Sequence, residues 1–248
     1  MQRLAIIGGT GLDQWGDSVK THDLVSDFGR PSAALSEYQL DGLTIFFLPR
    51  HGNSHNLPPH AINYRANIDI LTQVAVDAVV AVNAVGGISA KAGPGSLCLP
   101  DQLVDYTWGR DHSFSLTAED RLQHIEFATP FAGRIRAKLI KAAHSIDLDV
   151  RDGGCLGVTQ GPRLETAAEI RRLKNDGCDL VGMTSMPEAA LARERGLDYA
   201  SLCVISNMAA GLEAVPVSME AIDATLSVAM VKVRSLMAAL FKELTIDD

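Results

Sequence analysis

Short apolar runs recur along the chain, and amphipathic stretches separate them. Runs of this kind, rich in β-branched residues and bounded by glycine, proline or polar residues, are typical of buried strands. They predict strands at residues 4–7, 43–48, 78–82, 156–159, 180–183 and 201–206. Because strands that alternate with helices form sheets with helices packed on them, the pattern predicts an α/β fold with a central mixed β-sheet flanked by helices.

Several stretches between the strands repeat apolar residues at a spacing of three or four, which is the period of a helix. Two of them, residues 166–175 and 187–195, are followed by Gly177 and Gly196, the residue type that often ends a helix. The clearest period lies near the C-terminus, behind Ser218 as a good N-cap. Its apolar positions are Met219, Ile222, Leu226, Ala229, Val233, Met237, Leu240 and Leu244.

Composition and charge exclude several classes of protein. The chain has 248 residues without a linker, repeat or low-complexity tract, so we expect one domain over residues 1–248. Thirty acidic against 22 basic residues give a formal net charge of −8, which disfavours a nucleic-acid partner. No run approaches the ~20 apolar residues that span a bilayer, and no leader precedes the first strand, so we expect a cytoplasmic protein without a membrane segment.

The spacing of cysteines and histidines disfavours a metal site. Four cysteines lie far apart without a C-x-x-C pair, which predicts reduced and mostly buried thiols: Cys98, Cys155, Cys178 and Cys203. Three histidines lie closer together, at His51, His55 and His60. The proline pair before His60 and the spacings of four and five do not fit the one-face helical pair of a zinc site.

The residues that follow the predicted strands carry the candidate chemistry, because ligands of α/β sheets bind at the carboxyl ends of strands. The first strand runs into Gly8, Gly9, Thr10 and Gly11, where backbone N–H groups and a hydroxyl can converge on an anion. The run lacks the third glycine of G-x-G-x-x-G, since Gln14 stands there, and it lacks the lysine of a Walker loop. A structural tight turn and a phosphate contact remain equally open.

The second and third strands end in further candidates. Arg50 and His51 follow the second strand directly, so Arg50 is either well placed to fork onto a phosphate or an ordinary solvated loop arginine. The third strand is followed by a glycine-containing stretch over residues 83–89, which we expect to be a loop. That loop indicates either a plain turn or a close approach of the backbone to a ligand.

The fifth and sixth strands end beside a hydroxyl and an amide. Thr184 precedes a proline that fits the first turn of a helix, so it either binds an anion at the helix N-terminus or caps the helix. Asn207 can donate and accept at the edge of a ring, or it can be a buried structural asparagine. Together with Thr10, Arg50 and His51, these residues predict a phosphate site next to a polar ring.

Five motifs in order resemble those of the purine nucleoside phosphorylase and methylthioadenosine phosphorylase family, and the similarity covers essentially the whole chain. They are IIGGTGLD at 6–13, PRHG at 49–52, NYRANI at 63–68, GPRLET at 161–166 and GMTSMPE at 182–188. The resemblance implies a single α/β phosphorylase domain and a homotrimer. It also implies phosphorolysis of a purine nucleoside to a free base and a pentose 1-phosphate, with inorganic phosphate as co-substrate and no metal or organic cofactor.

The resemblance implies roles for the residues at matching positions, with Asn207 and His51 assigned to catalysis. Phosphate would be held by Thr10, Arg50, His51, Thr184 and the backbone region of Asn83 and Ala84. The nucleoside would contact Leu164, Glu165, Met183, Asn207, Met208, Ala209, Met219 and Ile222. His124, preceded by Gln123, matches a residue that reaches into the site of a neighbouring subunit. The chain departs from the usual family pattern at Leu164, where a phenylalanine is common, and at Ala209, where adenine-directed members often carry an aspartate.

Three positions decide the expected substrate. Members that cleave methylthioadenosine usually carry Ser and Asp at the places of Glu165 and Asn207, so this pair indicates a 6-oxopurine. Met219 stands where inosine-cleaving members place a histidine against the ribose 5′-hydroxyl, which indicates a 5′-methylthio group, unless Met219 is simply the first core residue of the last helix. We therefore expect phosphorolysis of S-methyl-5′-thioinosine to hypoxanthine and 5-methylthioribose 1-phosphate. Methylthioadenosine and inosine or guanosine remain alternative substrates.

Two hypotheses from other classes also remain open. A metal-dependent hydrolase would use the three histidines, and a non-catalytic domain would bind a purine or dinucleotide without turnover. Their responses to a chelator and to added phosphate distinguish them from a phosphorylase.

Overall fold

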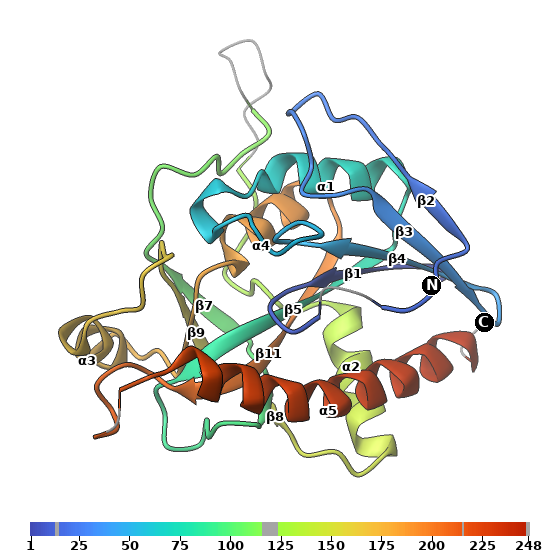
Figure 1. The fold of residues 1–248 in the computed structure, drawn as a ribbon. Helices are drawn as coiled ribbons and strands as arrows, with labels where there is room; N and C mark the ends of the chain where they lie inside the picture. Colours follow the sequence, from blue (N-terminus) through green and yellow to red (C-terminus); the bar gives the residue numbers. More distant parts are fainter. Residues whose placement is uncertain (13–14, 116–123, 215, 247–248) are drawn as a thin grey trace.

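A central mixed β-sheet carries helices on both faces (Figure 1). The computed structural model describes residues 1–248 except 13–14, 116–123, 215 and 247–248, so Asp13, Gln14 and Gln123 lie outside the described residues. The elements follow in the order β1 (Arg3–Gly8), β2 (Lys20–His22), β3 (Leu35–Leu40), β4 (Leu43–Pro49), η1 (Pro59–Ala61), α1 (Tyr64–Gln73), β5 (Ala78–Gly87), β6 (Leu97–Leu99), β7 (Gln102–Asp105), α2 (Arg134–Ser145), β8 (Val150–Asp152), β9 (Cys155–Val158), α3 (Ala167–Asn175), β10 (Leu180–Gly182), α4 (Ser185–Glu194), β11 (Asp198–Met208) and α5 (Met219–Ile246).

The predicted α/β class is confirmed, and the six predicted strands correspond to β1, β4, β5, β9, β10 and β11. The three predicted helices correspond to α3, α4 and α5. The sequence pattern did not indicate β2, β3, β6, β7 and β8. Apart from the buried β6, these strands are largely half-buried or exposed, so their sequences lack the continuous apolar run of the central strands.

One edge of β5 is paired along its whole length, and the other is paired only near its two ends, which leaves space for a cavity. β11 pairs with β5 along its whole length, with Asp198 opposite Ala78 and Met208 opposite Gly87. On the other edge, β1 covers only residues 78–81, and β10 covers only residues 86–87. The middle of this edge therefore faces a gap between the end of β1 and β10. Ligands of α/β sheets bind where neighbouring strands diverge in this way.

Side chains of the central strands alternate between two buried clusters. In β1, Leu4 and Ile6 belong to one cluster, and Ala5 and Ile7 belong to the other. The first cluster also contains buried residues of α2 and α5, and the second contains residues of α1 and α4. Figure 1 shows these two helix pairs on opposite faces of the sheet. Burial on both faces explains why the central strands read as continuous apolar runs.

The helix α5 belongs to the hydrophobic core, although it is apolar enough to resemble a membrane-spanning helix. Its segment Met219–Thr245 could cross a bilayer by length and composition alone, so the expectation that no segment reaches this threshold was wrong. The reason is that α5 carries apolar residues on its exposed side as well, at Val228 and Val231, in addition to its buried apolar face. Val233 and Leu236 are fully buried in the cluster under the sheet. A core helix of a folded domain explains this composition.

Two strands extend beyond their predicted ends. β5 continues to Gly87 through most of the expected loop 83–89, and β11 continues to Met208, two residues beyond the predicted strand 201–206. The two segments pair with each other, and this pairing extends both strands beyond their apolar runs. The register shifts between Ile205 and Asn207, which indicates a β-bulge. A bulge bends a strand and redirects a side chain, and here it does so at Asn207.

Two helices begin next to the strand ends, as predicted. Thr166 caps α3 and forms a capping box with Glu169. Thr184 precedes α4, whose second residue, Met186, has an extended backbone, so regular helix starts at Pro187. A proline in the first helical turn needs no N–H partner, which explains its place there.

We predict that Leu236→Ala lowers the free energy of unfolding by about 2–5 kcal/mol, the usual cost of a cavity at a buried leucine. Leu236 is fully buried in the core cluster that α5 forms with the sheet. Urea unfolding followed by circular dichroism measures the change. Val231→Ala on the same helix is the matched control, because Val231 is 65% exposed, and its effect should stay within about 0.5 kcal/mol. Small and equal effects of both substitutions would contradict the core position of α5.

Candidate functional site

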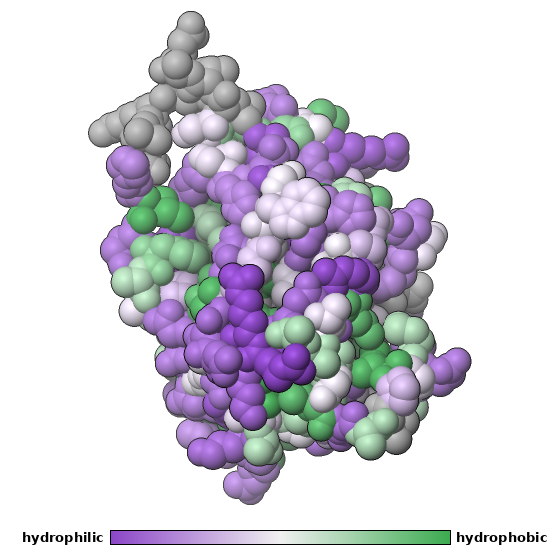
Figure 2. All heavy atoms as spheres, turned by 90° about the vertical axis from the view of Figure 1, so that its left-hand side faces the viewer, coloured by the Kyte–Doolittle hydropathy of each residue, from purple (hydrophilic) through white to green (hydrophobic). Residues whose placement is uncertain are grey.

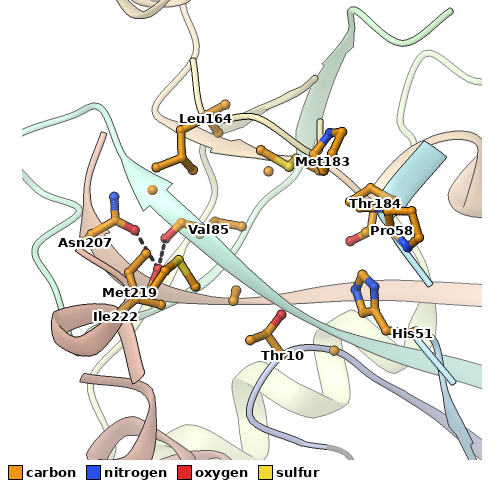
Figure 3. Close-up of a pocket in the computed structure, with 18 of the residues that line it drawn as sticks. Thr10, His51, Pro58, Val85, Leu164, Met183, Thr184, Asn207, Met219 and Ile222 are labelled. Carbon is orange, nitrogen blue, oxygen red and sulfur yellow. Dashed lines mark hydrogen bonds between the residues drawn. The ribbon is translucent and has the colours of Figure 1, made fainter. Parts of the chain in front are cut away.

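A cavity of about 560 Å³ opens at the gap on the edge of β5. Its walls come from the carboxyl ends of β1, β5, β10 and β11, from the loop after β4 and from the first turn of α5 (Figure 3). The predicted site residues that line it are Thr10, Arg50, His51, Ala84, Leu164, Glu165, Met183, Thr184, Asn207, Ala209, Met219 and Ile222. Residues far apart in the sequence thus meet where the strand-end argument expects them.

The cavity has two chemically different ends (Figure 3). The Arg50 end consists of Thr10, Arg50, His51 and Thr184. The Asn207 end consists of Leu164, Glu165, Asn207, Met219 and Ile222. Met183 lies between the two ends (Figure 3). A small polar group and a larger amphipathic group can therefore bind side by side.

Three predicted residues do not line the cavity: Asn83, Met208 and His124. Asn83 is buried in β5, and its Nδ2 donates to Ser201 Oγ at 2.8 Å. Met208 ends β11 next to Asn207, and its backbone carbonyl accepts a hydrogen bond from that side chain. His124 is exposed and lies outside the cavity of its own chain.

The cavity also includes residues that were not predicted to contact the nucleoside or the phosphate. His55, Asn56, Leu57 and the proline pair 58–59 form one wall. They lie only a few residues after Arg50 and His51, so their closeness to the predicted end of β4 is the sequence signal that marks them. Val85, Gly86 and Ser206 also line the cavity. Val85 and Gly86 lie in the stretch 83–89 that was expected to be a loop, and Ser206 is the last residue of the predicted strand 201–206.

Arg50 is the most deeply buried charged group at its end of the cavity. Its side chain is fully buried, and it binds Glu188 of α4, which is equally buried. Arg50 Nε donates to Glu188 Oε2 at 2.7 Å, and Nη2 donates to Oε1 at 2.9 Å. Nη1 donates to the carbonyl of Val82 at 3.0 Å. Arg50 therefore makes the expected bidentate interaction, but with the Glu188 carboxylate and not with a phosphate. Fewer of its N–H groups remain for a ligand.

Burial and charge explain why this ion pair persists. Burial opposes the charge of Arg50, but the charge and hydrogen bonds of Glu188 outweigh it and raise the pKa of Arg50 above its usual value. Tyr199 donates its hydroxyl to Glu188 Oε1 at 2.9 Å. Burial and the Glu188 carboxylate raise the pKa of Tyr199 well above its usual value, so Tyr199 stays a donor. Both charges are balanced and hydrogen-bonded, as a buried pair requires.

The glycine turn after β1 has a structural reason and also contributes to the cavity. A Cβ on Gly8 would lie 2.1 Å from the carbonyl oxygen of Leu12, and one on Gly9 would lie 3.0 Å from Arg50 Nη1. Gly11 has φ +84°, which favours glycine. The tight-turn interpretation is therefore correct. Gly9 and Thr10 nevertheless line the cavity, so the turn also brings backbone close to its contents.

Two histidines and a threonine lie together at the Arg50 end. His51 Nδ1 lies 2.8 Å from the carbonyl oxygen of Leu57, which can only accept, so this nitrogen carries a proton. The ring of His55 lies 4.6 Å from the ring of His51, measured between centroids. His55 Nε2 lies 3.4 Å from Thr10 Oγ1. This end therefore holds titratable groups in addition to the balanced ion pair.

Thr184 does not cap its helix with its side chain. Its hydroxyl donates to Asn83 Oδ1 at 3.0 Å, and Asn83 in turn donates to Ser201. The alternative that the Thr184 side chain caps the helix is therefore wrong, because its hydroxyl donates to Asn83 in β5. Asn83 acts beneath the cavity and holds Thr184 in place.

At the Asn207 end, two polar side chains are held by their neighbours. Glu165 accepts a hydrogen bond from Thr159 Oγ1 at 2.6 Å. Asn207 Nδ2 donates to the carbonyl of Met208 at 2.7 Å. Its Oδ1 accepts from Ser206 Oγ at 2.7 Å (Figure 3). Since the Met208 carbonyl can only accept, the orientation of the amide is determined. One amide proton and one lone pair remain for a ligand.

The mouth of the cavity at this end is apolar. Met219 is 59% exposed and Leu164 is 44% exposed, and both line the cavity. Met219 is therefore no core residue of α5, and that alternative is wrong. Figure 2, which views the side where β9, α3 and the start of α5 lie, shows apolar side chains grouped among polar ones on this face. An apolar group of a ligand can bind here.

Metal ligation finds no support in the described part of the chain. Among the described residues no group of three or more His, Cys, Asp or Glu side chains could hold a metal ion. His60 lies away from His51 and His55, in a separate cavity. The four cysteines are free, and Cys155 is only half-buried whereas the other three are buried, as predicted.

Fold and cavity together define the class of protein. The sheet is mixed, and the cavity lies where its central strands diverge. Residues 3–242 match the Phosphorylase superfamily. The chain belongs to this superfamily.

Individual members resemble the chain over most of its length. The protein named "Probable S-methyl-5'-thioinosine phosphorylase" of Xanthomonas campestris pv. campestris is 51% identical over 210 residues, 84% of each chain. The protein of the same name from Pseudomonas syringae pv. tomato is 46% identical over 236 residues, 94% of this chain and 96% of that one. Methylthioadenosine phosphorylase of Schistosoma mansoni, solved in complex with adenine, superposes with a TM-score of 0.93 at 30% identity, covering 100% of this chain and 93% of the other.

We predict that Glu188→Gln lowers the free energy of unfolding by about 3–5 kcal/mol, because it leaves the Arg50 charge buried and unbalanced. The double variant Arg50→Met with Glu188→Leu should recover most of this loss, since it removes both charges. Urea unfolding measures all three proteins.

Asp111→Asn is the matched control, because Asp111 pairs with Arg65 while 68% exposed. Its effect should stay within about 1 kcal/mol. A comparably small loss in Glu188→Gln would show that the ion pair contributes far less than its burial implies.

Proposed function

We propose that the protein cleaves S-methyl-5′-thioinosine with inorganic phosphate, giving hypoxanthine and 5-methylthioribose 1-phosphate. The two-ended cavity carries this proposal: a polar Arg50 end lies beside an Asn207 end that combines Glu165 and Asn207 with the apolar Met219. Superfamily membership and the names of the similar bacterial proteins support the same reaction.

We assign phosphate to the Arg50 end. Thr10, the remaining N–H groups of Arg50, His51 and the backbone at Ala84 surround the space available to it. Thr184 and Asn83 support this end through their hydrogen bond. Met183 lies between the two ends of the cavity (Figure 3). A ribose bound beside Met183 would therefore have a phosphate oxygen next to it. Proximity of this kind removes much of the entropic barrier to attack.

We assign the purine to the Asn207 end. Glu165 accepts from N1–H of a 6-oxopurine, and the free amide proton of Asn207 donates to O6 or N7. The C1′–N9 bond breaks, its electron pair passes into the purine, and a phosphate oxygen forms the new bond to the opposite face of C1′. Asn207 stabilises the negative charge that builds on the purine, in the manner of an oxyanion hole. The purine then takes up a proton and leaves as hypoxanthine, and the configuration at C1′ is inverted.

We assign the 5′ substituent to Met219 and Ile222. A thioether and an aliphatic side chain at the cavity mouth favour a methylthio group. A ribose 5′-hydroxyl would lose its water partners there without gaining a donor or acceptor from either side chain, which costs about 1–3 kcal/mol.

We also propose that the protein acts as a cytoplasmic homotrimer without a metal or organic cofactor. His124 would complete the cavity of a neighbouring subunit. Its exposure and its position outside the cavity of its own chain suit such a role.

Methylthioadenosine is the second candidate substrate, because the methylthioadenosine phosphorylase that superposes with a TM-score of 0.93 shares this fold over the whole chain. It would use the same phosphate and methylthio positions. The two candidates differ in the 6-substituent of the base and in the proton on N1, which only the 6-oxopurine carries.

Initial rates with methylthioinosine, methylthioadenosine, inosine and guanosine, each with and without phosphate, test the proposal. Methylthioinosine should have the highest kcat/KM, and cleavage should require phosphate and withstand a chelator. Cleavage that ignores phosphate and stops with the chelator would instead indicate a metal-dependent hydrolase. Tight binding of all four nucleosides without turnover would indicate a binding domain.

We predict that Asn207→Asp shifts preference toward methylthioadenosine. A carboxylate accepts from the 6-amino group and cannot share a proton with the Met208 carbonyl, so it turns toward the base. The ratio of kcat/KM for methylthioadenosine to that for methylthioinosine should rise about tenfold or more, equivalent to about 1.4 kcal/mol. Steady-state kinetics with both nucleosides measure it. An unchanged ratio would contradict the assignment of the base to this end.

We predict that Met219→His raises kcat/KM for inosine about tenfold, because the imidazole offers a partner to the 5′-hydroxyl. Met219→Leu is the matched control, since leucine keeps the site apolar and should leave inosine cleavage low. If histidine and leucine have the same effect, the 5′ group does not bind beside Met219.

A further inference from the structure

The Arg50 end has fewer unused donors than its residues suggest. The charge of Arg50 is balanced by Glu188 through two hydrogen bonds. His51 directs its Nδ1 proton to the carbonyl of Leu57, so a neutral His51 ring has only a lone pair at Nε2. The Thr184 hydroxyl donates to Asn83. A phosphate dianion bound here would therefore need a further donor, and a cationic one would serve best.

His55 lies where such a donor is needed. It lines the same cavity as Thr10 and His51. Its Nε2 is 3.4 Å from Thr10 Oγ1, and its ring is 4.6 Å from the ring of His51. The residue is exposed, so it can exchange a proton with solvent. A group placed between Thr10 and His51 would contact His55 as well.

The local backbone holds His55 in this position. The loop after β4 is closed by hydrogen bonds from Gly52 N to the Pro49 carbonyl, from His55 N to the Gly52 carbonyl and from Leu57 N to the His51 carbonyl. His55 itself has φ +49°, in the left-handed region that residues other than glycine rarely adopt. A side chain kept in a rarely used backbone conformation beside a site is a pointer to function.

We propose that His55 is a further phosphate-binding residue, which as an imidazolium donates from Nε2 to a phosphate oxygen shared with Thr10. The assignment rests on the proposed function, since it names an additional ligand of the same phosphate. His55 thereby supplies the positive charge that Arg50, balanced by Glu188, does not supply. Phosphate is then bound most tightly when the protein carries one more proton.

The charged groups around His55 agree with this role. His51 faces it from the same loop, and the Arg50 and Glu188 pair lies behind as a balanced unit. On the side of α5, a second cavity is lined by Thr10, His55 and Asp223. A charge-assisted hydrogen bond from an imidazolium to a phosphate dianion is stronger than one from a neutral donor.

The variant His55→Asn tests the assignment, because asparagine tolerates the left-handed backbone and removes the imidazole. The KM for phosphate should rise about tenfold, and the KM for methylthioinosine should stay within about twofold. His60→Asn is the matched control, since His60 lies on the same loop but outside this cavity, and it should leave both values unchanged. An unchanged KM for phosphate in His55→Asn overturns the proposal. So does an equal rise of both KM values, which would mean general damage to the site.

Sulfate binding provides a readout that a merely structural role would not change. Sulfate keeps its two negative charges between about pH 5.5 and 8, so any pH dependence of its affinity comes from protein groups such as histidine. Calorimetry should find that the wild type binds sulfate about tenfold more tightly at the acidic limit, and that His55→Asn loses most of this dependence. The same pH dependence in both proteins overturns the proposal.

The two experiments separate failure of the inference from failure of the proposed function. Sulfate binding requires no turnover, so His55 can be confirmed as an anion ligand even if the wild type cleaves no nucleoside. If the wild type shows phosphate-dependent cleavage while His55→Asn keeps its phosphate KM and its sulfate profile, the proposed function stands and the assignment of His55 is wrong.

Discussion

The buried ion pair between Arg50 and Glu188 is the interaction on which the arrangement of the site depends. It connects the loop after β4 to α4, and its third hydrogen bond reaches Val82 in the middle of β5. A Cβ on Gly9, the residue after β1, would lie 2.6 Å from the Val82 carbonyl oxygen that accepts from Arg50, so this position requires glycine. The loop after β4, the middle of β5 and the helix α4 are thus held at one point. The same pair balances the charge of Arg50, which explains why the polar end of the cavity needs further donors such as His55.

The cavity itself follows from the unequal use of the two edges of β5. β11 pairs along the whole strand, whereas β1 and β10 cover opposite ends of the other edge. Between them the strand faces open space, and the bulge in β11 redirects Asn207 beside it. The phosphate and purine positions of the proposed reaction are therefore consequences of strand pairing. Met219 joins them because α5 begins at the mouth of the same gap.

The sequence predicted the central strands and the residues at their ends, because both depend on local pattern. Thr10, Arg50 and Thr184 are therefore recognisable as site residues from the sequence alone. The partner of Arg50 was not, since Glu188 is 138 residues away and reads as an ordinary helical carboxylate. The extension of β5 beyond its apolar run also depends on pairing with β11, which no local pattern contains. His55 was noticed only as a metal ligand, because its neighbours in space, Thr10 and the His51 ring, were unknown.

The central claim is that phosphate, bound at the Arg50 end, attacks C1′ while a purine leaves from the Asn207 end. Phosphorus NMR of the products from methylthioinosine and phosphate tests it most directly. The account predicts a single new phosphate ester, 5-methylthioribose 1-phosphate with inverted configuration at C1′, formed in equal amount to hypoxanthine. Free methylthioribose, or a sugar phosphate with retained configuration, would contradict direct attack by the bound phosphate.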